Sequence, residues 1–143
     1  MATVLGRMYP SLTIYSYEPV PVNYQNLLRN LAINNVTNVK PFNLAVTADG
    51  RPFELTVHPG SNSGGATGNI SDLDLKEHQR FSAPSTTLEE IFATHDIQRC
   101  RLLKIDCEGS EYEILFNAES INKIEYLCGE FHINEHLERQ GYS

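Results

Sequence analysis

The chain has 143 residues, of which 41% are hydrophobic, and its 18 acidic and 11 basic residues give a net charge of −7. We expect one domain over residues 1–143 at this length and composition. The acidic balance argues against nucleic acid as a partner, because such partners require clustered positive charge. The absence of a long apolar run and of a signal-peptide pattern predicts a cytoplasmic protein with no membrane partner. The three cysteines, which show no C-x-x-C spacing, are typical of reduced thiols.

The first part of the chain predicts a strand, a helix and a second strand. Residues 12–18, LTIYSYE, are β-branched and aromatic, and this strand ends at Glu18. A helix over 22–35 follows, with Pro21 at or just before its first turn and Asn34-Asn35 at its end. One helical face carries apolar residues at spacings of three and four: Tyr24, Leu27, Leu28 and Leu31. An extended pattern resumes at Val39.

The middle of the chain predicts a hairpin, a loop and a helix. Asp49-Gly50 is a tight-turn signal, and apolar residues alternate with polar ones over 53–58. Residues 60–72 are rich in Gly, Ser and Asn and predict a loop, which could bind an anion, cover a substrate or simply connect elements. Thr86 with Glu89 three residues later indicates a capping box at the start of the next helix.

The last part predicts a strand over 100–106, a helix over 109–121 and a strand over 124–133. Strands that alternate with helices favour an α/β fold with a mostly parallel sheet and helices on its faces. Ligands of such sheets bind beyond the carboxyl ends of the strands, where this chain has Glu18, Asp106 and Glu108. A carboxylate at the Glu18 position suits the two vicinal hydroxyls of a ribose.

Several blocks of this sequence resemble the FkbM-type methyltransferases. They are EPVP after Tyr17, TTLEEI at 86–91, LLKIDCEGSEYEIL at 102–115 and GEFHINEHLERQGY at 129–142. The resemblance implies a Rossmann-like class I methyltransferase fold, a three-layer sandwich, with S-adenosylmethionine as cofactor. It also implies O-methylation of a sugar or secondary-metabolite hydroxyl.

Two parts of the family pattern have no counterpart in this chain. The glycine-rich D-x-G-A-x-x-G motif of the first strand is absent, and the sequence stops at Ser143, before the closing antiparallel strands. We therefore expect a truncated domain lacking the first strand and the C-terminal antiparallel strands. A homo-oligomer could cover the sheet edges that this leaves exposed.

The resemblance also implies roles for individual residues at the cofactor. Glu18 corresponds to the ribose-binding carboxylate, with a surface acid before a proline turn as the alternative. Asn43, Leu44 and Ala45 follow the third strand, beside the adenine, and core packing is their alternative. Asp106 lies beside the reactive methyl group.

Catalysis and substrate binding are assigned to other side chains of the same rim. Asp106 and Glu108 are the candidate catalytic acids, although Asp106 could instead cap the next helix. Glu130 and His132 lie two apart on the last strand, which predicts a shared face that flanks substrate. They could also hold a metal with Asp106, but we expect polar residues at a strand end and no metal. Ser63 is the candidate substrate residue of the loop at 60–72.

Neighbouring charges are given structural roles, and two further functions remain open. Lys104 is expected to pair with a nearby carboxylate, and Glu111 and Glu113 are expected to be solvated acids near a helix start. One alternative function is a non-catalytic binding or interaction module of the same fold. The other is a metal-dependent hydrolase using Asp106, Glu108, Glu130 and His132.

Overall fold

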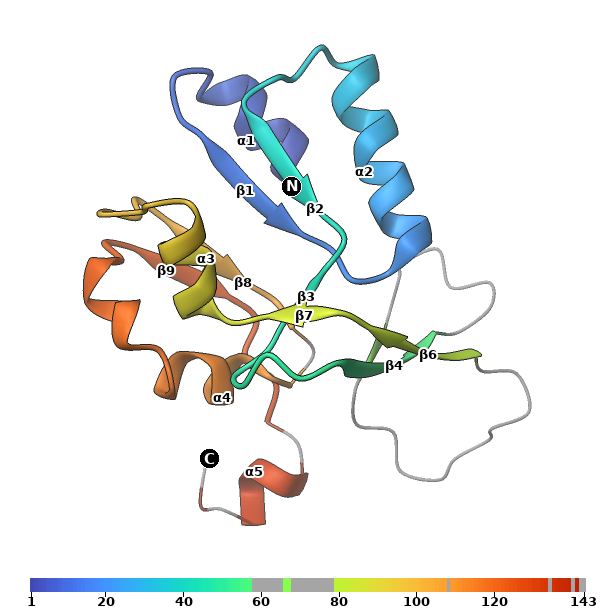
Figure 1. Ribbon diagram of the computed structural model, residues 1–143, viewed down its shortest axis with the longest axis vertical. Helices are drawn as coiled ribbons and strands as arrows, with labels where there is room; N and C mark the ends of the chain where they lie inside the picture. The colour runs from blue at the N-terminus through green and yellow to red at the C-terminus, as the bar shows by residue number, and fades with distance from the viewer. Residues whose placement is uncertain (58–65, 68–78, 108, 134, 140, 142–143) are drawn as a thin grey trace. The chain divides into compact units, whose positions relative to one another are not determined.

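The computed structural model describes residues 1–57, 66–67, 79–107, 109–133, 135–139 and 141 (Figure 1). The candidate residues Ser63 and Glu108 lie outside these ranges. The chain divides into two compact units, Met1–Ala45 and Val46–Ser143, each of which is described by itself.

The first unit is a parallel strand pair with two helices against it (Figure 1). Its elements are α1 (Ala2–Met8), β1 (Ile14–Tyr17), α2 (Pro21–Ile33) and β2 (Val39–Phe42). β1 and β2 are in parallel register from Ile14 opposite Val39 to Tyr17 opposite Phe42. The helix between them is the crossover that a parallel pair requires.

Helix α2 follows the sequence pattern closely. Pro21 occupies its first turn, where the missing N–H leaves no bond unmade. Leu31 is buried, and the other three residues of the predicted apolar face are half-buried. The helix ends at Asn34, and Asn35 adopts φ 53°, the left-handed conformation that asparagine tolerates. The prediction of this helix and of its end is confirmed.

Helix α1 was not predicted from the sequence. Its seven residues are too few to show a helical period, and the pattern is interrupted by Gly6. That glycine is buried, and a Cβ there would lie 2.5 Å from Val36 Cγ1 and 2.9 Å from Val39 Cγ2. The close approach of α1 to the segment before β2 therefore depends on glycine at this position.

The first half of the second unit contains an antiparallel sheet of three strands, and its pairing corrects the predicted hairpin. β4 (Phe53–Val57) pairs with β6 (Gln79–Ala83) and β5 (Ala66–Thr67), while β3 (Ala45–Val46) is paired with β7 (Ser85–Thr86). The hairpin prediction around Asp49-Gly50 is wrong, because the strands on either side of this bend have different partners.

Thr47 explains why the bend does not become a hairpin. Its N–H donates to the Thr86 carbonyl, and its hydroxyl donates to Ser85 Oγ and accepts from the Gly50 N–H. These bonds attach the segment before the bend to β7. The alternation beyond the bend is confirmed at its described side chains, with Leu55 buried and Glu54 exposed.

The second half of this unit alternates helices with a parallel strand pair. Its elements are α3 (Leu88–Thr94), β8 (Leu103–Ile105), α4 (Glu111–Phe116), the 3₁₀ helix η1 (Glu119–Lys123), β9 (Leu127–Gly129) and α5 (Glu135–Arg139). β8 and β9 are parallel. Side chains from α3, β8 and α4, together with the residue before η1, form one buried cluster: Leu88, Phe92, Ile105, Ile114, Leu115 and Ala118. The α/β class and the parallel pairing of both strand pairs are confirmed.

The capping box of α3 lies one residue later than predicted. Thr87 accepts from the Glu90 N–H, and Glu90 accepts from the Thr87 N–H. Glu89, the predicted partner, instead accepts from the N–H and hydroxyl of Ser120 in η1. Both Thr-x-x-Glu registers exist in the sequence, and the contact with η1 selects the second one.

Among the helices that the structure describes, none has the length and apolar character needed to cross a membrane.

Replacing Gly6 by Ala tests the close approach of α1. In an open helix this change adds about 1 kcal/mol of stability. Here the new methyl group overlaps Val36 and Val39, so we expect a loss of about 1–3 kcal/mol in the free energy of unfolding, measured with urea. In a Val36→Ala background the loss is expected to shrink. The close contact would be contradicted if Gly6→Ala raised the free energy of unfolding. It would also be contradicted if the losses caused by Gly6→Ala and Val36→Ala were additive.

Candidate active site

The register of β8 and β9 brings two predicted site acids together. Ile105 lies opposite Gly129 in this parallel pair, so the residues that follow, Asp106 and Glu130, leave the two strands side by side. A Cβ at Gly129 would collide with the Ile105 carbonyl oxygen, so the pair closes this tightly only with glycine. Both acids therefore lie at the carboxyl ends of parallel strands, as predicted.

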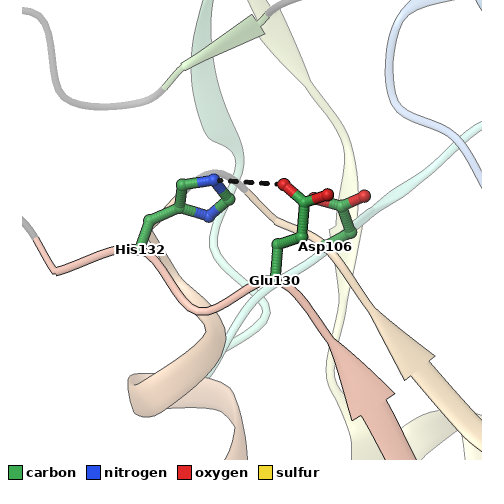
Figure 2. A group of neighbouring side chains, drawn as sticks. All are labelled: Asp106, Glu130 and His132. Carbon is green, nitrogen blue, oxygen red and sulfur yellow. Dashed lines mark ion pairs between the residues drawn. The ribbon is translucent and has the colours of Figure 1, made fainter.

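His132 completes a group of three side chains with these acids (Figure 2). One ligand atom of each of Asp106, Glu130 and His132 lies within 4.8 Å of the others. His132 Nε2 is 3.8 Å from Glu130 Oε2. The prediction that Glu130 and His132 lie on the last strand is wrong, because β9 ends at Gly129. Their predicted convergence is nevertheless observed just beyond the strand.

The segment that carries Glu130 and His132 is packed against α4. The rings of Tyr112 in α4 and Phe131 are 5.8 Å apart in an edge-on arrangement. This contact fixes the residue between the two site side chains. Beyond β9, aromatic packing of a short segment thus takes the place of the predicted β-strand face.

Glu111 is the residue that the sequence analysis misjudged. It was expected to be solvated, but it is fully buried. Its carboxylate accepts from the N–H groups of Cys107 and Gly109 at 2.7–3.2 Å, and its Oε1 lies 3.3 Å from His132 Nδ1. Gly109 has φ 106°, which folds the turn after β8 so that these N–H groups face the helix start. Glu113, by contrast, is exposed as predicted.

A signal for Glu111 was present in the sequence. It is the final acid of the K-I-D-C-E-G-S-E block, directly after a glycine turn. A turn of this kind presents several backbone N–H groups that need an acceptor. An acid placed two residues beyond the glycine supplies it.

The contacts of Glu111 keep its carboxylate ionised. Burial alone raises the pKa of Glu111, but hydrogen bonds from the backbone N–H groups and from His132 outweigh burial, so the pKa lies below its ordinary value. An ionised carboxylate only accepts hydrogen bonds, so Nδ1 of His132 is the donor in their contact. The other ring nitrogen, Nε2, is then directed toward Glu130.

Lys104 pairs with Asp106, which confirms the predicted ion pair. Lys104 Nζ lies 2.8 Å from Asp106 Oδ2, and about one third of each side chain is exposed. The alternative role of Asp106 as a helix cap is not observed, because the residue before α4 is Ser110. Asp106 thus faces the rim formed with Glu130 and His132.

The cysteine beside this rim is a buried thiol. Burial raises the pKa of Cys107 to about 11, so it is protonated at neutral pH. All three cysteines are free, which confirms the prediction of reduced thiols. Cys107 therefore packs beside the site and is no nucleophile.

The predicted cofactor residues Glu18 and Asn43 lie together in the first unit. Glu18 directly follows β1, and its Oε1 accepts from the Val20 N–H at the start of α2. Asn43 Nδ2 donates to the carbonyls of Glu18 and Pro19, at 2.7 and 3.1 Å. Leu44 is half-buried and Ala45 is buried. Asn43 therefore holds the turn that carries Glu18.

The environment of Glu18 opposes its charge. Burial raises the pKa of Glu18, although hydrogen bonds from the Val20 N–H and the Asn23 side chain act in the other direction. A carboxylate held in this way lowers folding stability at neutral pH, which is more typical of a binding residue than of a structural one.

Parallel strand pairs, each followed by an acidic side chain, define an α/β protein with candidate sites at its strand ends. The family model described as "Methyltransferase FkbM domain" matches residues 4–141. The chain therefore belongs to the FkbM methyltransferase domain family.

Two curated relatives have similar sequences. The chain is 25% identical over 130 residues to "Methyltransferase 1" of Beauveria bassiana (strain ARSEF 2860), covering 78% of this chain and 51% of that protein. It is 27% identical over 139 residues to "Methyltransferase sdnD" of Sordaria araneosa, covering 78% and 53%. The chain thus spans about half the length of these relatives. No solved structure matches the chain significantly.

Replacing Glu111 by Ala measures how strongly its contacts stabilise the second unit. The N–H groups of Cys107 and Gly109 would lose their acceptor, at about 1–3 kcal/mol each. We expect the free energy of unfolding to fall by at least about 2 kcal/mol. Glu113→Ala, on the same helix but exposed, is the matched control and should change stability by less than about 0.5 kcal/mol. Equal effects of the two substitutions would contradict the assigned contacts.

Proposed function

We propose that this protein is an S-adenosylmethionine-dependent O-methyltransferase that acts on a hydroxyl group of a sugar or secondary metabolite. The observation that carries the proposal is the family match over residues 4–141, together with the methyltransferase names of both relatives. We further propose the Rossmann-like class I sandwich as its fold. The two parallel strand pairs are units from which such a sheet is built.

Glu18 is the proposed ribose-binding residue, and its surroundings fit this role. It follows the carboxyl end of β1, at the position where folds of this class place a ribose-binding acid. A carboxylate has about four acceptor positions. The Val20 N–H and the Asn23 side chain use only part of this capacity. Two vicinal hydroxyls can be accommodated, with Asn43, Leu44 and Ala45 proposed to lie near the adenine.

Asp106 and Glu108 are the proposed catalytic acids. When bound, S-adenosylmethionine supplies an already activated methyl group, so the protein mainly has to align the acceptor oxygen. Asp106 lies at the end of β8, where it can orient a hydroxyl or accept its proton. Its pairing with Lys104 holds one carboxylate oxygen in place.

The acceptor is proposed to contact Glu130 and His132, with Ser63 as a further candidate. Both rim residues are partly exposed and converge on Asp106, so a small polar molecule can reach all three. Imidazole and carboxylate groups suit a substrate that carries several hydroxyls. Association between copies of the chain stays a prediction.

The two other functions inferred from the sequence rank below methyl transfer. A non-catalytic binding module would need the fold but not the rim of Asp106, Glu130 and His132. A metal-dependent hydrolase would use that rim for a reaction that neither relative's name describes. Methyl transfer accounts for both the family and the acidic strand ends.

Replacing Glu18 by Gln separates a binding role from a structural one. Calorimetry with S-adenosylhomocysteine should show weaker binding by about 1.5–3 kcal/mol, because charge-assisted hydrogen bonds to the ribose are lost. The free energy of unfolding at pH 7 should stay equal or rise, because the folded protein raises the pKa of Glu18 and its ionised form is therefore unfavourable.

Glu54→Gln, an exposed acid on β4, is the control and should leave both quantities unchanged. An affinity unaffected by Glu18→Gln, together with lost stability, would show that Glu18 is structural. Cofactor binding by this chain would be contradicted if calorimetry of the unaltered chain showed no heat of binding with millimolar S-adenosylhomocysteine.

A further inference from the structure

We propose that Asp106, Glu130 and His132 form a binding site for a divalent first-row transition-metal cation. Figure 2 shows the three side chains directed toward one another from the ends of β8 and β9. One ligand atom of each lies within 4.8 Å of the others. A cation placed among them would have all three atoms within reach after small side-chain rotations.

The chemistry of the three side chains favours this class of cation. They offer two carboxylate oxygens and one imidazole nitrogen. Carboxylates suit Mn²⁺, Mg²⁺ and Ca²⁺, whereas imidazole suits Zn²⁺ and Fe²⁺. A mixed set therefore favours Mn²⁺, Fe²⁺ or Zn²⁺ over Mg²⁺ and Ca²⁺, which prefer oxygen ligands alone.

Glu111 supplies an independent feature of a metal site. Histidines that bind metals nearly always donate their other ring N–H to a carboxylate or carbonyl, which fixes the ring and its tautomer. Here the fully buried Glu111 accepts from His132 Nδ1. Nε2, the other ring nitrogen, lies 3.8 Å from Glu130 Oε2, on the side of the rim. Glu111 is itself held by hydrogen bonds from the N–H groups of Cys107 and Gly109. The carboxylate that orients the His132 ring is therefore fixed in place.

The charges of the rim also favour a cation. Asp106 and Glu130 place two negative charges close together. A third carboxylate, that of Glu111, contacts Nδ1 of His132. Lys104 offsets one of these charges through Oδ2 of Asp106. A carboxylate has two oxygens, so Asp106 can keep Lys104 and still offer a second oxygen to a metal.

Three protein ligands would leave coordination positions open. Metal sites that bind substrate keep such positions, whereas closed sites with four ligands are structural. If the proposed function holds, an acceptor hydroxyl could occupy an open position and become more acidic there. The metal site itself does not depend on that function and can be tested without a methyl donor.

Titration with Mn²⁺, followed by electron paramagnetic resonance and calorimetry without S-adenosylmethionine, tests the site. We expect one Mn²⁺ per chain, and weaker binding of Ca²⁺. Glu130→Gln should lower Mn²⁺ affinity by at least about tenfold. Because the Glu130 side chain is 76% exposed, this substitution should leave the fold intact. Glu54→Gln, an exposed acid outside the rim, is the matched control and should bind as the unaltered chain does.

A second variant tests the orienting role of Glu111. Glu111→Gln should lower Mn²⁺ affinity by about 10–100-fold, the range found when such partners of ligating histidines are changed. Circular dichroism establishes first that this variant is folded. No Mn²⁺ binding at millimolar concentration, or equal binding by the unaltered chain and Glu130→Gln, would overturn the site. Unchanged affinity in folded Glu111→Gln would overturn the role given to Glu111.

Discussion

The buried carboxylate of Glu111 is the contact on which the rim after β8 and β9 depends. It accepts from the Cys107 and Gly109 N–H groups in the turn after β8 and from His132 beyond β9. Two chain segments that are far apart in sequence are thereby joined through one side chain. A buried charge of this kind is stable only with such a full set of hydrogen bonds. Once they are made, the positions of Asp106 and His132 follow from the strand register and the orientation of the ring.

In each of the two units, the hydrogen bonds of one side chain hold the turn that follows a parallel strand. In the first, Asn43 holds the carbonyls of the Glu18–Pro19 turn, so that the acid after β1 is presented in a fixed place. In the second, Glu111 holds the turn after β8. Each of these turns follows a strand of a parallel pair, and α/β folds bind ligands at such strand ends. We propose that the turn after β1 serves the cofactor, and that the turn after β8 serves the acceptor and a metal.

Sequence patterns predicted the parts of this fold that depend on local signals. Helix α2 was predicted with its start and end, because Pro21 and Asn35 mark them directly. The hairpin predicted at Asp49-Gly50 is wrong, because β4 pairs with β6, a distant partner that a turn signal does not reveal. Among the candidate site residues, Asp106 follows its strand as predicted, whereas Glu130 and His132 were predicted on the last strand and lie just beyond it. Glu111 was misjudged because exposure at a helix start depends on the neighbouring turn, which only the folded chain shows.

The proposed function depends most directly on Glu18, the acid that follows β1, binding the ribose of a nucleoside cofactor. A crystal structure of the chain with S-adenosylhomocysteine tests this most directly. The account predicts both ribose hydroxyls within hydrogen-bonding distance of the Glu18 carboxylate. A nucleoside bound without contact to Glu18 would contradict it.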